Sequence, residues 1–163
     1  MALALPDLQS ELKGLYDKGK TGNPEPIMVG LKTGTAYFNY VSAGMNAAGF
    51  PFTAMPGTME LQDGIGNLLK KTVPDGRIFA LKMAKAFTKC LDTWMSVNQT
   101  VMVALPGMPG LQSELMDIFS KPMPDNSAFA MALGRALNNY TVSAVVMGII
   151  PDTPGIPFTG PIS

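Results

Sequence analysis

The sequence predicts an all-α protein of three tandem helical hairpins, each a short helix followed by a long helix, joined by Pro/Gly-rich extended loops. The first observation is a repeat, because Leu8-Gln9-Ser10-Glu11-Leu12 returns unchanged as Leu111-Gln112-Ser113-Glu114-Leu115 and a weaker copy begins at Leu61. The second is that apolar residues recur at three- and four-residue steps after each copy. The third is that many prolines and glycines lie between these stretches. Self-similarity with a period of about fifty residues is typical of repeat architectures.

Each short helix is expected after a proline-containing segment and carries one apolar stripe. These segments are Leu5-Pro6-Asp7, Met55-Pro56-Gly57-Thr58 and Met108-Pro109-Gly110. The spacing of the apolar residues that follow puts them on one face of a helix of about three turns. The stripes are Leu8, Leu12, Leu15 and Tyr16, then Leu61, Ile65, Leu68 and Leu69, then Leu111, Leu115, Ile118 and Phe119.

A proline-containing breaker separates each short helix from a longer helix, which is expected to run for about 20 residues. The breakers cover residues 22–26, 73–76 and 121–125. Asp75 and Asp125 are predicted N-caps, because a carboxylate can accept the unpaired amide hydrogens of the first helical turn. The apolar faces of the second and third long helices extend to Val97 and Val145.

The first long helix contains Gly30 and Gly34, which each weaken it by about 1 kcal/mol relative to alanine. The segment Gly30-Leu31-Lys32-Thr33-Gly34 lacks the spacing and the preceding strand of a phosphate-binding loop. Its small-xxx-small pattern instead predicts close packing against another helix.

The loops after the long helices are rich in Gly, Pro, Met and aliphatic residues. Proline at this density forbids a helix and disfavours a central strand, so we expect these loops to be extended or turn-like. Pro51-Phe52-Thr53 recurs as Pro157-Phe158-Thr159, which is a further sign of repetition. The predicted single domain, residues 1–163, therefore contains repeats at 5–50, 56–101 and 107–150, followed by an extended C-terminal tail at 151–163.

The low charge of the chain predicts that other chains cover much of its surface. Only 15% of the residues are charged, against about 25% in typical soluble domains. The tail is too apolar for a solvated linker and too rich in proline to fold alone, so we expect it to become ordered only against a neighbour. The predicted partner contacts are Phe50, Phe52, Met55, Met102, Met108, Ile156 and Phe158.

Several classes of function are disfavoured by composition. The chain has no histidine and one cysteine, Cys90, so it offers neither imidazole nor thiolate clusters for a metal and no Ser-His-Asp machinery. We therefore predict no cofactor and no enzymatic activity. The net charge of zero disfavours a nucleic-acid partner, since such proteins usually carry a basic excess. The longest apolar run, Val142 to Ile150, is too short to span a bilayer, and the N-terminus lacks the basic region of a signal peptide.

One basic cluster, Lys82, Lys85 and Lys89, lies at three- and four-residue steps on the second long helix. It could contact a phosphate or an acidic partner, or it could be the solvated face opposite Met83 and Phe87. The spacing favours the solvated face, and the sequence leaves open whether the cluster is functional.

The overall style of the sequence resembles small virion structural proteins of tailed bacteriophages, such as tail, baseplate or capsid accessory subunits. The resemblance spans the whole chain and includes the composition, the opening Leu5-Pro6-Asp7-Leu8-Gln9-Ser10-Glu11-Leu12 and the repeated short-helix/long-helix unit. It implies a non-enzymatic virion component, assembled in the host cytoplasm in many symmetric copies that contact other structural proteins. It carries over no functional residue, because this group has no shared catalytic motif.

A peripheral membrane or lipid-binding helical module is the alternative function. The apolar stripes would suit it, but helices that lie in a membrane interface usually carry a polar face rich in Lys and Arg. Only the second long helix has such a face, so the structural role is the preferred prediction.

Overall fold

The structure is a computed structural model that describes residues 3–16, 25–71, 75–96, 101–150 and 154–163; the predicted breaker residues 22–24 and 73–74, and Val97, lie outside this range. The described residues form six helices and five short strands. The helices are α1 (Leu5–Tyr16), α3 (Pro26–Ser42), α4 (Thr58–Lys70), α5 (Gly76–Leu91), α6 (Met108–Ser120) and α7 (Asn126–Ser143). The strands are β1 (Phe52–Ala54), β2 (Met95–Ser96), β3 (Val101–Ala104), β4 (Val145–Ile150) and β5 (Ile156–Pro161).

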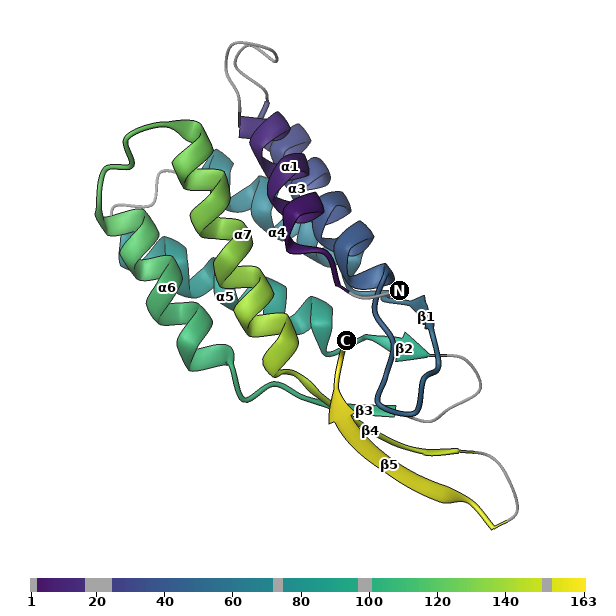
Figure 1. Cartoon of the computed structure of the whole chain (residues 1–163). Helices are drawn as coiled ribbons and strands as arrows, with labels where there is room; N and C mark the ends of the chain where they lie inside the picture. The colour runs from purple at the N-terminus through teal and green to yellow at the C-terminus, as the bar shows by residue number, and fades with distance from the viewer. Residues whose placement is uncertain (1–2, 17–24, 72–74, 97–100, 151–153) are drawn as a thin grey trace.

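The helices form a closed ring. Each helix packs against the helices before and after it in the chain, and α7 closes the cycle by packing against α1 (Figure 1). Each long helix, α3, α5 or α7, therefore lies between its own short helix and the next short helix around the ring. The mostly helical architecture agrees with the sequence prediction.

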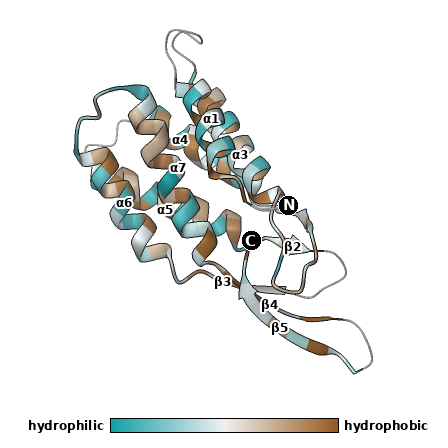
Figure 2. Ribbon diagram, viewed as in Figure 1, coloured by the Kyte–Doolittle hydropathy of each residue, from teal (hydrophilic) through white to brown (hydrophobic). Residues whose placement is uncertain are grey.

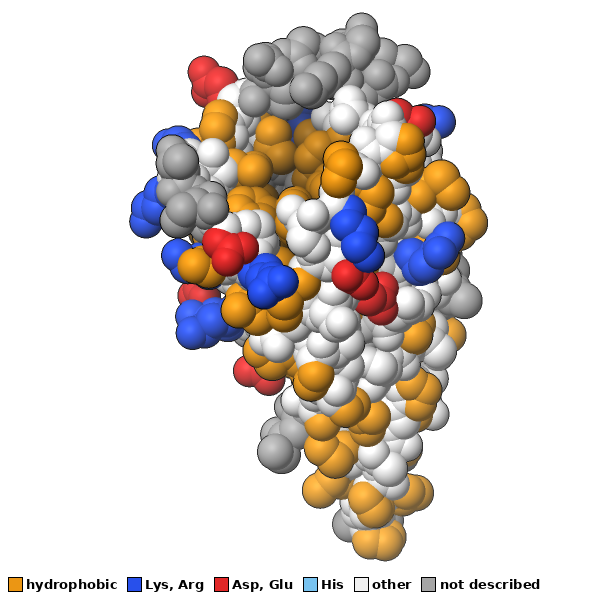
Figure 3. All heavy atoms as spheres, turned by 90° about the vertical axis from the view of Figure 1, so that its left-hand side faces the viewer, with side chains coloured by type: hydrophobic (Ala, Val, Ile, Leu, Met, Phe, Trp, Pro, Cys, Tyr) orange, Lys and Arg blue, Asp and Glu red, His pale blue; other side chains and the backbone are white. Residues whose placement is uncertain are grey.

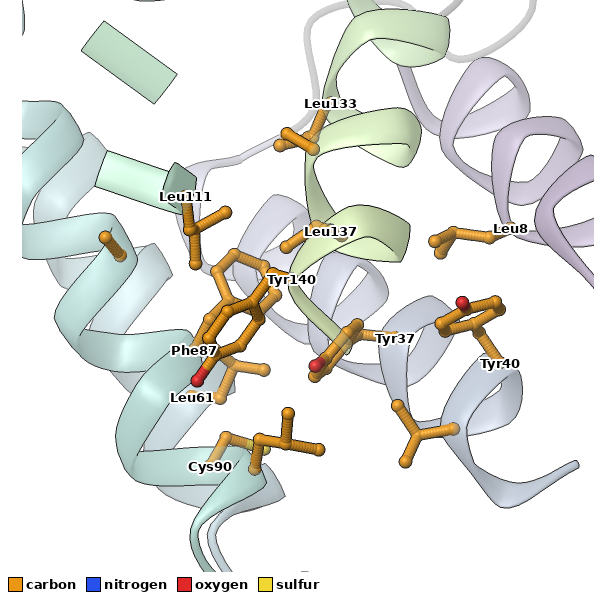
Figure 4. Close-up of a cluster of buried hydrophobic side chains, with 14 of the residues drawn as sticks. Leu8, Tyr37, Tyr40, Leu61, Phe87, Cys90, Leu111, Leu133, Leu137 and Tyr140 are labelled. Atoms are coloured by element: carbon orange, nitrogen blue, oxygen red, sulfur yellow. The ribbon is translucent and has the colours of Figure 1, made fainter. Parts of the chain in front are cut away.

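The core lies inside this ring and is built from the predicted apolar stripes. Leu8, Leu61 and Leu111, one from each short helix, are buried. Tyr37 and Phe87 of two long helices meet at their rings, with centroids 4.9 Å apart and planes at 82°, and Leu137 of the third lies beside them (Figure 4). In the view coloured by hydropathy, the helices carry hydrophobic and hydrophilic residues on different faces (Figure 2). Burial of these stripes is the main force that holds the ring together.

Close approach of α3 and α4 depends on glycine. A Cβ atom on Gly30 would lie 2.5 Å from the backbone nitrogen of Gly66, and one on Gly34 would lie 2.5 Å from Cγ of Gln62. Cβ atoms do not tolerate such distances, so the two helices could not pack this closely with larger residues. The prediction that Gly30 and Gly34 allow close helix packing is confirmed.

The prediction of a purely all-α fold is wrong, because the loops contain two small antiparallel sheets. One pairs β1 with β2, and the other has the order β3-β4-β5. The third long helix ends at Ser143, and the β-branched residues that follow it form β4 instead of continuing the helix. Pro157 and Pro161 are compatible with β5 because this strand lies at the sheet edge, where a missing amide hydrogen is tolerated.

The C-terminal tail is held by its own chain, which corrects the prediction that it is ordered only against a neighbour. All six residues of β5 pair with β4, from Ile150 opposite Ile156 to Val145 opposite Pro161. Beyond the strand, Ser163 and Met45 exchange two backbone hydrogen bonds of 2.8 and 3.0 Å. Ile162 is buried in the core. The described part of the tail therefore packs against the rest of the chain at the end of the molecule that carries the strands.

The two predicted N-caps are present. Asp75 Oδ1 accepts a hydrogen bond of 2.8 Å from the amide of Arg77, and Asp125 Oδ1 accepts one of 2.7 Å from the amide of Ala128. These bonds satisfy amides that have no partner within their helices.

Substitution of Asp125 by alanine is expected to lower the free energy of unfolding by about 1 kcal/mol, because the amide of Ala128 loses its acceptor. Asp125→Asn keeps an acceptor oxygen and should stay close to wild type in urea denaturation. Equal losses in the two variants would show that the cap is not the source of the stability.

Candidate functional site

Several of the predicted partner contacts are used inside the chain. Met55 is 3% exposed and belongs to the core, so its assignment to a partner surface is corrected. Phe52, Met108 and Phe158 are half-buried and pack against the core. The ring of Phe52 lies 5.3 Å from that of Phe38 at an angle of 80°. Phe52 in β1 and Phe158 in β5 can face the helical ring because successive side chains of a strand lie on opposite faces.

Three predicted contacts have other positions. Ile156, in β5, is 56% exposed, and Phe50 is half-buried in the loop before β1. Met102 lies in β3 at the register position opposite Met147, while its side chain falls outside the described part of the structure. Among the predicted contacts whose side chains are described, Ile156 is therefore the most accessible.

The hairpin formed by β4 and β5 presents an apolar surface that we call the hairpin surface, consisting of Met147, Ile149, Ile156 and Pro157. Ile149 and Ile156 are each 56% exposed, and Met147 and Pro157 are also exposed. Ile149 pairs directly with Pro157, so their side chains share one face of the sheet, whereas Ile156 pairs with Ile150 and lies on the other face. The strands contain no charged residue.

The hairpin extends away from the helical ring at the end that carries both sheets (Figure 1). In the space-filling view, this narrow end carries hydrophobic side chains and no charged side chains on the face shown (Figure 3). Exposed apolar side chains on both faces of a projecting hairpin are typical of contact sites in soluble proteins. Sequence reasoning missed Met147 and Ile149, although the uncharged run from Val142 to Ile150 was visible.

The lysine cluster lies on α5, on the side that borders α4. Lys82, Lys85 and Lys89 are exposed, while Met83 and Phe87 on the opposite face of α5 are buried, as the solvated-face interpretation predicts. The same three lysines also line a hollow of about 270 Å³ between the two helices.

Burial suppresses the ionisation of two titratable groups in the core, Cys90 and Tyr37. Burial raises the pKa of the Cys90 thiol to about 12, although Thr58 lies within hydrogen-bonding distance of its sulfur. Its thiolate, the nucleophilic form, is therefore scarce at neutral pH. Burial also raises the pKa of Tyr37 well above its ordinary value, and the hydrogen bond to Thr141 opposes this shift.

Among the described residues, no group of three His, Cys, Asp or Glu side chains is placed to hold a metal ion. In the same part of the chain, none of the helices combines the length and the apolar character that a membrane span requires. Comparison of the chain with models of known protein families, with curated proteins and with solved structures found no match.

Proposed function

We propose that the chain consists of three repeated hairpins, α1–α3, α4–α5 and α6–α7, closed into a ring. The buried leucines of the short helices and the central residues Tyr37, Phe87 and Leu137 occupy matching positions in the three repeats. The cyclic packing of the helices supports this arrangement, because each long helix meets the short helix of the following repeat.

The contacts of the repeated Leu-Gln-Ser-Glu-Leu phrase support the triplication further. Asn39 Nδ2 donates to the Glu11 carboxylate at 3.3 and 3.4 Å, and Asn139 Nδ2 donates to that of Glu114 at 3.2 and 3.5 Å. In two of the short helices, the glutamine after the first leucine of the motif lies against a glycine of the long helix that precedes it around the ring. Gln62 of α4 lies against Gly34 of α3, and Gln9 of α1 lies against Gly134 of α7.

The function that this structure supports best is that of a non-enzymatic structural protein in a multi-copy assembly. The observation that carries this proposal is the uncharged hairpin surface, where Ile149 and Ile156 are exposed to solvent beyond the helical ring. Burial of apolar area releases about 25 cal/mol per Å², so this surface gains free energy when it meets another subunit. Together with the resemblance described above, this surface supports a virion component that is assembled in the host cytoplasm and contacts other structural proteins.

Self-association tests this proposal. Purified wild-type chain is expected to form multi-copy species in size-exclusion chromatography with light scattering, because the hairpin surface becomes buried between copies. The double variant Ile149→Thr/Ile156→Thr keeps β-branched residues in the strands but removes apolar contact area. It should remain monomeric at the same protein concentration.

Leu81→Gln provides the control, since Leu81 is an exposed apolar residue on α5 away from the hairpin. This variant should associate like wild type. A wild-type chain that stays monomeric up to its solubility limit, or a double variant that associates normally, would contradict the proposal. Flotation of the monomeric chain with liposomes would instead support the membrane-module alternative.

A further inference from the structure

We propose that the hollow between α4 and α5 binds a small ligand that has one carboxylate and a short aliphatic body. The hollow combines three cationic side chains with an apolar floor. Neither the assembly function nor the core packing uses this combination.

The walls of the hollow differ in chemistry. Lys82, Lys85 and Lys89 line it from α5, and Glu60 lines it from α4. Half-buried Leu68, Ala86 and Gly64 provide its less polar surface. Its volume of about 270 Å³ is slightly below the roughly 300–1,000 Å³ of pockets that hold drug-sized molecules, so it suits a smaller ligand.

The lysines carry positive charge that the described chain does not neutralise. Among the described residues, the only ion pair is that of Lys121 with Asp117, so none of the three lysines lies within 4.0 Å of a carboxylate oxygen there. Like charges at these spacings on one helix repel each other. A bound anion would relieve this repulsion, and hydrogen bonds from ammonium groups to a carboxylate are stronger than those between neutral groups.

Comparison of the three hairpins, which relies on the proposed triplication, identifies the missing group as a carboxylate. Glu11 and Glu114 lie three residues after Leu8 and Leu111, and each accepts hydrogen bonds from an asparagine. In the middle hairpin, the position three residues after Leu61 is Gly64. The position matching Asn39 and Asn139 is Lys89. The middle repeat thus lacks the carboxylate of the other two and has a cation where they have a neutral donor.

The corresponding hollow between α1 and α3 has a different charge balance. Its volume is about 380 Å³. The charged residues in its lining are one lysine, Lys32, and one carboxylate, Glu11. Positive charge is therefore unbalanced in the middle hairpin, whereas the first hairpin supplies its own carboxylate. Even with Glu60, the three lysines leave a net positive charge in the middle hollow, which a ligand carboxylate would reduce.

Titration with hexanoate, followed by the amide signals in two-dimensional NMR spectra, tests the proposal. We expect saturable shifts at Gly64, Leu68, Ala86 and Lys89, with a dissociation constant of about 1 mM, which is reasonable for so small a ligand. Hexanol should bind at least about tenfold more weakly, because it lacks the charge that the lysines attract. Equal binding of hexanol, no saturable shifts, or tighter binding of hexyl phosphate would overturn the proposal.

The double variant Gly64→Glu/Lys89→Asn rebuilds the Glu–Asn pair of the other two hairpins and should abolish hexanoate binding. A Cβ atom on Gly64 would make an ordinary contact, 3.7 Å from the Cβ of Ala86, so the first atom of the new side chain causes no clash. Lys32→Asn, in the hollow of the first hairpin, is the control and should bind as wild type does. Unchanged binding in the double variant would overturn the proposal.

A second variant keeps the test decisive if the first does not fold. Lys85→Gln/Lys89→Gln changes exposed side chains only and should weaken hexanoate binding at least about tenfold, since two of the three ammonium groups are lost. Wild-type affinity in this variant would also overturn the proposal.

Discussion

Replacement of Gly30 by valine is expected to lower the free energy of unfolding by about 3 kcal/mol, because overpacking of a tight contact forces the backbones apart. A Cβ atom at this position would lie 2.5 Å from the amide nitrogen of Gly66 and 2.8 Å from its Cα, and it would also meet the carbonyl oxygen of Gln62. All three atoms belong to the backbone of α4, so no side-chain rotation can relieve the clash. The helices α3 and α4 must separate, and the ring loses core contacts there.

Urea denaturation measures this effect, and Gly14→Ala is the matched control. Gly14 lies in α1 and a Cβ atom there would have nothing within 4 Å. Alanine at this position should therefore stabilise the protein by about 0.5–1 kcal/mol through helix propensity alone. A Gly30→Val variant as stable as wild type would show that α3 and α4 do not pack as closely as described.

The second large effect is expected at Phe87, where truncation to alanine should cost about 4 kcal/mol. Phe87 is fully buried, and its ring meets that of Tyr37 edge-on in the centre of the ring of helices. Removal of the Phe87 side chain loses its apolar burial and its contact with Tyr37. It also leaves a cavity that the surrounding helices can fill only in part, because each is held by its other neighbours.

Denaturation of Ile78→Ala serves as the comparison for Phe87→Ala, because Ile78 is an exposed apolar residue on the same helix. This variant should change the free energy of unfolding by no more than about 0.5 kcal/mol. Similar losses in both variants would contradict the placement of Phe87 at the centre of the core.

The helices could be predicted from sequence because helical periodicity reports burial directly. Leu8, Leu61 and Leu111 belong to stripes with three- and four-residue spacing, and all three are buried as predicted. The apolar spacing predicts a second long helix whose face extends to Val97, yet α5 ends at Leu91 and Trp94 is buried beyond it. Residues beyond the end of a helix can still be buried in the core, so the spacing of apolar residues does not show where the helix ends.

The pairs β1–β2 and β3–β4 could not be predicted because each joins segments that are distant in sequence. Phe52 of β1 lies opposite Ser96 of β2, and Val101 of β3 lies opposite Gly148 of β4. Strand preference depends on such cross-strand neighbours more than on the local residues. The density of proline and glycine predicted extended loops but not their pairing into sheets. The position of Met55 in a loop did not reveal that its side chain is buried.

The lysines of the hollow were visible in the sequence, but the hollow was not. Gly64 of α4 lines it, at the position where the proposed triplication places a glutamate in the other two hairpins. The spacing of apolar residues gives no information about a polar residue, such as a glutamate at position 64, that is absent from the sequence. Alignment of the three proposed repeats position by position, with Lys89 against Asn39 and Asn139, draws attention to it.

The most direct test of the central proposal is a three-dimensional reconstruction, by electron cryo-microscopy, of the particles that the purified wild-type chain forms. We expect several symmetric copies, each with its helical ring closed by α7 against α1 and with Ile149 and Ile156 buried at subunit contacts. Particles in which the hairpin surface faces solvent, or a chain that forms no particles, would contradict the proposal.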